Sequence, residues 1–201
     1  MRKANEHSPA KEKLLETARR LMQTQGYSAT SVDQICEAAG LTKGCFFHYF
    51  KSKEELGKAV LDFYVLTSDQ MIAQAHFLKK KDPLHRLYGY LDFMIEIVRN
   101  PAYESACLLG NLAQELSDTH PEIRARCASH FTRLTVVFKN IVDETKASYA
   151  PGTRLDTQSL SDYFIVVLEG SILLAKAKQD KGIIEKSLQH FKQYLKTLFE
   201  K

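Results

Sequence analysis

A short run of rings and lysines near the N-terminus holds the residues whose types could do chemistry. Five aromatic residues follow one another from Phe46 to Phe50, and they are flanked by Lys43, Lys51 and Lys53. At 100° per residue, five consecutive rings point all round a helix, so a small bundle cannot bury them all. Cations beside outward-facing rings fit the phosphate backbone and base methyl groups of DNA. The pattern predicts a nucleic-acid interface, with a core corner beside solvated lysines as the bland alternative.

Two short predicted helices position these residues. Ser31 and Gln34 form a capping box that opens the first helix, and Gly40 ends it. Thr42 caps the second helix, which runs to about Phe50. Two short helices joined by a tight glycine-containing turn are the helix-turn-helix pattern, whose second helix lies in the major groove of DNA.

Two residues of the second helix are unusual for a purely structural element. Lys43 lies in its first turn, where the helix dipole disfavours a cation. Gly44 follows it and lowers the helix propensity, but a glycine lets another backbone approach closely. Both features favour contact with a partner outside the chain.

The rest of the sequence predicts an all-α fold. Helix start and stop signals and apolar periodicity indicate further helices, and no strand or internal repeat is evident. Three short helices fill residues 9–50 and longer ones follow, which predicts two modules sharing the helix that begins at Ser52. The further helices are predicted at about residues 9–25, 52–76, 83–99, 107–116, 121–147, 156–178 and 183–199.

Composition excludes several classes of protein. The chain has 201 residues, of which 44% are apolar and 26% charged, and only 5 are proline, as in an ordinary globular protein. No apolar run is long enough to cross a membrane, and the charged N-terminus lacks a signal-peptide core, so we expect a cytoplasmic protein without a membrane partner. The net charge is +4, and residues 1–60 hold 10 basic against 7 acidic residues, which weakly favours a polyanion there.

Catalytic and metal sites find little support in the sequence. The spacing of Cys36, Cys45 and His48 fits no common zinc pattern, so no metal and no cofactor are expected. No nucleophile–base spacing and no glycine-rich phosphate loop is evident, which argues against an enzyme. A helical thiol- or His-dependent enzyme that binds no nucleic acid, and a helical adaptor that binds only protein, remain the alternatives.

The segment Gly26–Leu56 closely resembles the signature of the TetR family of regulators. The resemblance implies an N-terminal three-helix DNA-binding domain over residues 1–55. It also implies a C-terminal helical effector-binding and dimerisation domain over residues 56–201. The function it implies is not enzymatic: a homodimeric transcriptional repressor that binds double-stranded operator DNA and is released by a small molecule or electrophile.

Carried over position by position, the resemblance implies eight DNA-facing residues. Phe47 stands where the family usually has tyrosine, which removes a hydroxyl donor, and Cys45 replaces a common threonine. Phe46 and Phe50 are four residues apart and are expected to pack inward. The implied DNA-facing residues are Thr30, Thr42, Lys43, Gly44, Phe47, His48, Tyr49 and Lys53.

Residues 106–126 resemble a TetR subgroup that includes the repressor of N-ethylmaleimide reductase, with Ala106 in place of its usual glycine. The resemblance implies an effector pocket and electrophile sensing by Cys107, and the competing interpretation makes Cys107 a small buried hydrophobe. The same residue types on helical stripes are also typical of a core. The candidate ligand-binding residues are Tyr64, Tyr90, Phe93, Met94, Cys107, Asn111, Phe131 and Tyr163.

Two apolar stripes on the last two helices predict the homodimer interface. A two-fold DNA site needs two recognition helices, and a monomer supplies one. Stripes from two copies could form a four-helix interface, although part of each must also face the chain's own core. The stripes are Leu160, Phe164, Leu168 and Ile172 on one helix, and Ile184, Leu188, Phe191 and Leu195 on the other.

Overall fold

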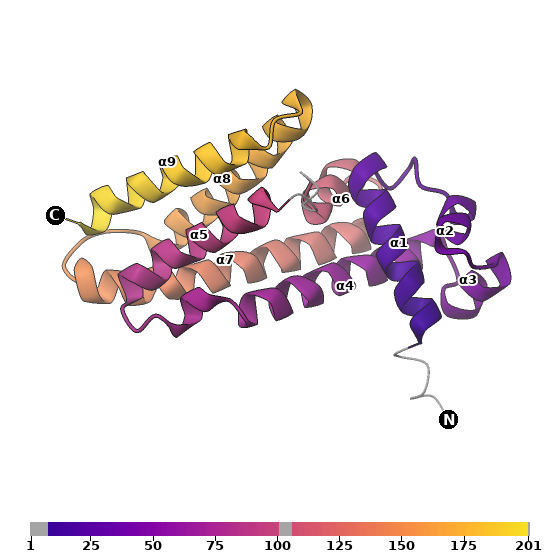
Figure 1. Cartoon of the computed structure of the whole chain (residues 1–201), viewed down its shortest axis with the longest axis horizontal. Helices are drawn as coiled ribbons and strands as arrows, with labels where there is room; N and C mark the ends of the chain where they lie inside the picture. The colour runs from indigo at the N-terminus through magenta and orange to yellow at the C-terminus, as the bar shows by residue number, and fades with distance from the viewer. Residues whose placement is uncertain (1–7, 101–105, 201) are drawn as a thin grey trace. The chain divides into compact units, whose positions relative to one another are not determined.

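A computed structural model describes residues 8–100 and 106–200, and every regular element within them is a helix (Figure 1). This confirms the predicted all-α fold. The chain divides into two compact units, built from the described parts of residues 1–69 with 107–128, and of residues 70–106 with 129–201. The units interleave along the sequence, so they do not follow the predicted boundary between residues 55 and 56.

The first unit contains the first three helices of the chain, which gather together in Figure 1. A short helix from the middle of the chain joins them, and α1 contacts α2, α3 and this α6. Its elements are α1 (Pro9–Gln25), α2 (Val32–Ala39), α3 (Lys43–Tyr49), most of α4 (Lys53–Ala73), α6 (Leu108–Leu116) and the start of α7 (Pro121–Tyr149).

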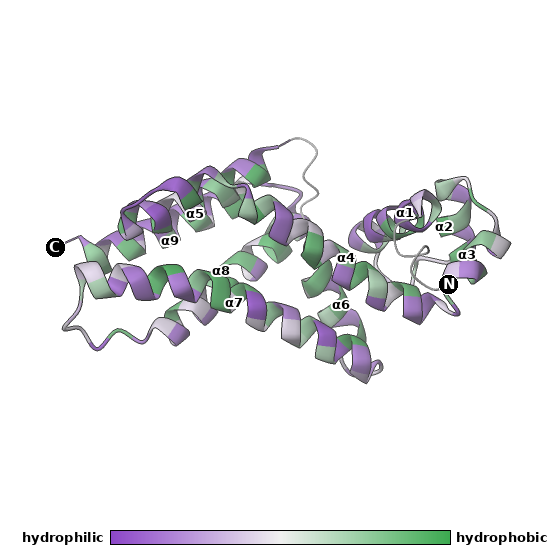
Figure 2. Cartoon of the chain, turned by 90° about the horizontal axis from the view of Figure 1, so that it is seen from below, coloured by the Kyte–Doolittle hydropathy of each residue, from purple (hydrophilic) through white to green (hydrophobic). Residues whose placement is uncertain are grey.

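The second unit is built around α5, α8 and α9. Helix α9 packs against both α8 and α5. The helices of the chain alternate between apolar and polar stretches (Figure 2), as amphipathic helices do when one side faces a core. The elements of this unit are η1 (His76–Lys79), α5 (Pro83–Arg99), α8 (Thr157–Lys178), α9 (Gly182–Phe199) and the remainders of α4 and α7.

The local signals that open and close the N-terminal helices work as predicted. Ser31 and Gln34 form the reciprocal capping box of α2. Gly26 and Gly40 end α1 and α2 with φ of 90° and 60°, values that favour glycine. The Thr42 hydroxyl accepts a hydrogen bond from the Cys45 N–H at 3.1 Å and so caps α3. Each helix therefore begins and ends within a residue or two of its predicted position.

The start of α4 shows a variation on the predicted capping box. The Ser52 hydroxyl accepts from the Glu55 N–H at 3.1 Å, as expected. The Glu55 carboxylate reaches one residue further back and accepts from the Lys51 N–H at 2.8 Å. Two orphan backbone donors are still satisfied, so the helix starts where the sequence predicts.

The core of the second unit is a cluster of aromatic rings. Phe138 and Phe164 stack with their ring centroids 4.2 Å apart and their planes at 19°. Tyr90 and Phe191 approach both rings at centroid distances of 5.4 to 6.1 Å. Phe138 and Phe164 are fully buried, so this cluster dominates the packing of the unit.

The predicted dimer stripes face the core of the single chain. All eight residues are buried within the single chain, with at most 9% of their surface exposed. Side chains this buried leave little surface for contact with a second copy. The eight residues are Leu160, Phe164, Leu168, Ile172, Ile184, Leu188, Phe191 and Leu195.

Candidate nucleic-acid interface

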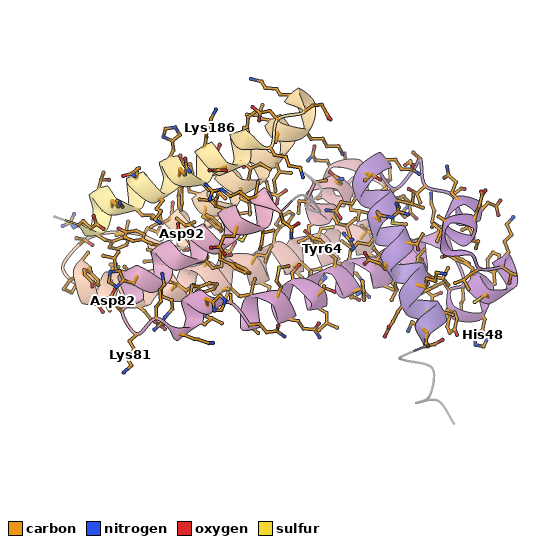
Figure 3. All side chains as sticks on the ribbon, in the orientation of Figure 1. His48, Tyr64, Lys81, Asp82, Asp92 and Lys186 are labelled. Carbon is orange, nitrogen blue, oxygen red and sulfur yellow. The ribbon has the colours of Figure 1, made fainter. Side chains whose placement is uncertain are left out.

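One face of α3, together with its N-terminal cap, is exposed. Counted from Lys43 at 100° per residue, Phe47, Gly44 and His48 fall within an arc of about 140°. All of them and Thr42 are exposed, and His48 lies at the outer edge of the three-helix group (Figure 3). This face can therefore meet a partner along its whole length.

The opposite face of α3 anchors the helix. Phe46 and Phe50 are buried, as predicted from their spacing. Cys45 is partly exposed, and Tyr49 is half-buried with its hydroxyl 2.7 Å from the Ser8 hydroxyl at the start of α1. A helix of seven residues is marginal alone. Its buried rings and this hydrogen bond hold it in place.

Phe47 is the most prominent apolar group on the exposed face, with 57% of its surface exposed. Its ring and the Phe46 ring meet edge to face at a centroid distance of 5.1 Å. An apolar ring on a polar surface suits contact with a thymine methyl group.

Lys43 is paired in the free protein. Its ammonium lies 2.7 Å from the Asp33 carboxylate, and both side chains are exposed. The hydrogen bond to Asp33 raises the pKa of Lys43. The lysine is therefore charged at neutral pH, with Asp33 as its ion-pair partner. Asp33 was not among the residues predicted from the sequence, since the two positions lie ten residues apart in different helices.

Two predicted DNA-facing residues point into the chain. Thr30 is fully buried, and its hydroxyl donates to the Gly26 carbonyl at 2.7 Å. The Lys53 ammonium donates to the carbonyl oxygens of Tyr27 and Thr30 at 3.1 Å each and lies 4.2 Å from the centre of the Tyr27 ring. Thr30 cannot reach DNA from this position, and Lys53 stabilises the turn between α1 and α2.

Helix α6 also binds the backbone at the turn between α1 and α2. The Glu115 carboxylate accepts hydrogen bonds from the backbone N–H groups of Tyr27 and Ser28 at 2.8 and 2.7 Å. The Asn111 amide donates to the Gln23 carbonyl at 2.9 Å. The turn that sets the position of α2 and α3 is thus fixed by a segment more than eighty residues away in the sequence.

Replacing Glu115 with alanine is expected to lower the free energy of unfolding by about 1 kcal/mol, because two charge-assisted hydrogen bonds to a partly exposed carboxylate are lost. Burial opposes ionisation of this carboxylate, but hydrogen bonds from Ser28 and Tyr27 lower its pKa below the ordinary 4.5. Its stabilisation is therefore present above pH 4.5 and lost as the pH falls through the lowered value.

Urea unfolding of the wild type and of Glu115→Ala across pH 3 to 7 checks this expectation. The stability difference between the two chains should shrink below pH 4.5. Gln114→Ala, at the neighbouring exposed position, is the control and should change stability little. A difference between wild type and Glu115→Ala that does not vary with pH would contradict the assigned role of the carboxylate.

Comparison with protein families accounts for both halves of the chain. Residues 14–60 match the model described as bacterial regulatory proteins of the tetR family. Residues 83–191, more than half of the chain, match a tetracyclin repressor-like C-terminal domain. The chain belongs to the TetR family.

Relatives and solved structures agree with this TetR assignment over nearly the whole chain. The repressor DhaR of Mycobacterium sp. is 27% identical over 96% of this chain and 92% of its own. The Escherichia coli repressor NemR is 21% identical over 98% of both chains. The crystal structure of a regulatory protein TetR from Rhodobacter sphaeroides, 26% identical, covers 92% of this chain and 98% of its own with a TM-score of 0.80.

The predicted effector-binding residues of this TetR protein are divided between the two units. Tyr64, Cys107 and Asn111 belong to the first unit, and the other five belong to the second. Asn111 has its partner in the Gln23 carbonyl, and Cys107 is buried with 7% of its surface exposed. In the second unit, Tyr90 belongs to the aromatic core and Phe93 contacts the Phe77 ring at 5.7 Å. The remaining candidates are Met94, which is half-buried, Phe131, and Tyr163, which is 50% exposed.

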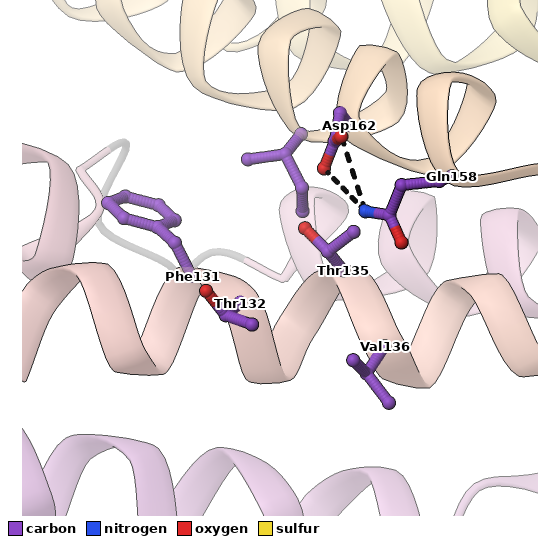
Figure 4. A pocket seen from close by; sticks show the side chains of 7 residues that line it. Phe131, Thr132, Thr135, Val136, Gln158 and Asp162 are labelled. Carbon is purple, nitrogen blue, oxygen red and sulfur yellow. Dashed lines mark hydrogen bonds between the residues drawn. The ribbon is translucent and has the colours of Figure 1, made fainter.

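A small cavity lies between α7 and α8. Its volume is about 250 Å³, just below the roughly 300–1,000 Å³ of most ligand pockets. Gln158 donates to both Asp162 carboxylate oxygens at 3.2 Å on the α8 side, and Thr135 faces them from α7 (Figure 4). Of the predicted ligand-binding residues, only Phe131 lines it. The full lining is Phe131, Thr132, Thr135, Val136, Gln158, Asp162 and Ile165.

The described residues offer little to the other classes of site. They contain no group of three or more His, Cys, Asp or Glu side chains able to hold a metal ion. None of the helices in the described part of the chain is long and apolar enough to cross a membrane. All four cysteines are free thiols, and burial raises the pKa of Cys36 and raises that of Cys127 to about 11.

Proposed function

We propose that this TetR-family protein is a transcriptional repressor that binds a two-fold operator as a homodimer and leaves it when an effector binds. The exposed face of α3 carries the proposal. It presents a charged lysine, a glycine and an exposed aromatic ring on a helix whose other face is anchored in the core. That is the arrangement by which a recognition helix reads the major groove.

The relatives support repression as the direction of control. DhaR and NemR are both named transcriptional repressors, and the sequence likeness to each spans almost the whole chain. A repressor acts where the chromosome is, so in a bacterium we place the protein in the cytoplasm.

We further propose an exposed stripe on α8 as the dimer surface, in place of the buried stripes. Tyr163, Val166, Leu173 and Leu174 are 50% to 65% exposed. They surround Gly170, where an added Cβ would meet no atom within 4 Å. Large apolar side chains around an open glycine suit close approach of a second helix, and TetR-family proteins act as dimers. The α8 stripe is defined as these five residues.

The effector is proposed to be a small molecule that acts on the second unit. The α7–α8 cavity combines an aromatic ring with a carboxylate and an amide, so it could orient a small ligand that has a hydrogen-bond donor. Electrophile sensing by Cys107 has less support, because a buried thiol is a poor target for modification.

The enzyme alternative is disfavoured by the state of the thiols. A nucleophilic cysteine needs a lowered pKa and access to solvent. Cys36 and Cys127 are buried with raised pKa values instead. The adaptor alternative is disfavoured by the relatives, which are named as transcriptional regulators.

Replacing Lys43 with alanine is expected to weaken operator binding at least tenfold, whereas Lys196→Ala on α9 should leave it within twofold. Loss of a phosphate contact should lower the slope of log affinity against log salt by about 1 per subunit. Loss of a guanine contact should lower discrimination at one base pair by about 1–3 kcal/mol.

The DNA for this measurement is a duplex that the wild-type protein selects from a randomised pool, with affinity followed by fluorescence anisotropy. Selection of a two-fold symmetric sequence supports the repressor. If the wild type enriches no sequence even at low salt, the proposed function is wrong. Equal affinities of the two variants would remove Lys43 from the interface.

A further inference from the structure

A carboxylate lies on the DNA-facing side of the helix-turn-helix. Asp33 in the first turn of α2 and Lys43 in the first turn of α3 form an ion pair of 2.7 Å, and 66% and 59% of their side chains are exposed. An exposed pair of this kind contributes little to stability. An anion beside the recognition helix also repels DNA phosphates. The first turn of α2 favours a carboxylate through the helix dipole, and at this place Asp33 also pairs with Lys43.

Lys43 supplies a large share of the positive charge around α3. Three lysines flank this helix, but the ammonium of Lys53 is turned to the carbonyl oxygens of Tyr27 and Thr30. Lys43 and Lys51 are exposed. Pairing with Asp33 thus cancels about half of the cationic charge that α3 and its flanks could offer to a phosphate backbone.

We propose that Asp33 is a specificity-determining residue, which holds the Lys43 ammonium in a fixed direction and keeps it from binding phosphates indiscriminately. This inference rests on the proposed function. An ammonium has three N–H donors. Lys43 can therefore keep its bond to Asp33 and still donate to an acceptor on a base edge.

The ion pair between Asp33 and Lys43 affects binding to arbitrary DNA and binding to the operator differently. Binding to arbitrary sequences depends almost entirely on neutralising phosphates. To neutralise a phosphate, Lys43 must leave Asp33. The Asp33 carboxylate is then left unpaired beside the phosphates. On the operator, Lys43 donates to its acceptor on a base edge while it stays paired with Asp33. Asp33 accordingly lowers the affinity for arbitrary DNA more than the affinity for the operator.

The test compares Asp33→Asn with Glu37→Gln. Both changes remove one exposed negative charge from α2, but only the first breaks the pair with Lys43. Each variant is titrated, over a range of salt concentrations, with a 20-bp duplex of scrambled sequence and with the duplex selected by the wild type. Circular dichroism confirms that each variant is folded.

For Asp33→Asn we expect the affinity for scrambled DNA to rise about fivefold per subunit, with the salt slope steeper by about 0.9 per subunit. The affinity for the selected duplex should change less than twofold, so the specificity ratio of a dimer falls more than tenfold. Glu37→Gln should change both affinities by less than twofold. In a Lys43→Gln background, Asp33→Asn should change both affinities by less than twofold, as Glu37→Gln does.

Three results would overturn the inference: equal gains on both duplexes, equal effects of Asp33→Asn and Glu37→Gln, or an Asp33→Asn effect that is undiminished without Lys43. A wild-type protein that selects no sequence would overturn the proposed function and this inference together. A wild type that selects a sequence, with Asp33→Asn unchanged from it, overturns this inference alone.

Discussion

Replacing Gly44 with alanine is expected to stabilise the folded chain and, at the same time, to weaken its binding to operator DNA about 100-fold. Inside the chain the new methyl group has room, because its nearest neighbour would be the Thr42 hydroxyl at 3.7 Å. Gly44 does not need a left-handed backbone either. Alanine at such a site adds about 0.4–1 kcal/mol of stability, or about 1–4 °C in melting temperature for a chain of this size.

The loss of binding follows from the same methyl group. No contact within the described residues requires a glycine at this exposed position of α3, so we assign the space above it to the DNA backbone. Filling a close contact costs about 1–3 kcal/mol, and about 1.4 kcal/mol is a factor of ten. A dimer has two such helices, so the free-energy cost of binding is doubled.

Thermal unfolding and anisotropy titrations on the same preparations measure both changes. Gly152→Ala is the matched control, since it adds a methyl group at a second open glycine, one in the loop after α7. It should leave DNA binding unchanged. Undiminished DNA binding by Gly44→Ala would show that α3 does not approach DNA through Gly44.

The sequence predicts the N-terminal helices closely because their signals are local. Ser31 and Gln34 cap α2 within four residues, and Gly26 and Gly40 end their helices by their own conformation. The inward direction of Phe46 and Phe50 follows from their spacing alone. None of these features depends on a segment far away in the chain, so periodicity and capping rules suffice.

The roles of individual polar side chains are harder to predict, because they depend on long-range partners. Lys53 looks like a phosphate ligand in the sequence, but it is drawn to carbonyl oxygens 23 and 26 residues earlier. Glu115 accepts from backbone groups 87 and 88 residues earlier in the chain, and Asn111 donates to one 88 residues earlier. No local pattern reveals those contacts. Both lie in the resemblance over residues 106–126, and Asn111 is also a polar residue among leucines that needs a partner if it is buried.

Helix α8 shows a different limit, since it is apolar on two sides. The spacing of Phe164 and its neighbours predicts one apolar side of the helix, but it does not tell whether that side faces the core or a second copy. The packing of α9 against α8 decides the matter, because it stacks the Phe164 ring among Phe138 and Phe191. The more regular stripe therefore forms the core, and the other side remains exposed.

Replacing Leu173 with glutamate is expected to convert the dimer into monomers at micromolar concentration. The side chain is 52% exposed in the single chain, so a charge there can stay hydrated in the monomer. In the proposed dimer the same charge would be buried against a second apolar helix without a partner, which is costly. A monomer offers one recognition helix to a two-fold site, so operator affinity should fall at least 100-fold.

Light scattering measures the mass, and anisotropy measures the affinity. The matched control is Leu66→Glu, the same change at a 55% exposed leucine on α4, which should leave a dimer. Phe164→Ala separates this surface from the stripe first predicted. Phe164 is fully buried, so its loss should lower the free energy of unfolding by about 3–5 kcal/mol, whatever the oligomeric state. A Leu173→Glu chain that keeps the mass of a dimer would exclude the α8 stripe as the interface.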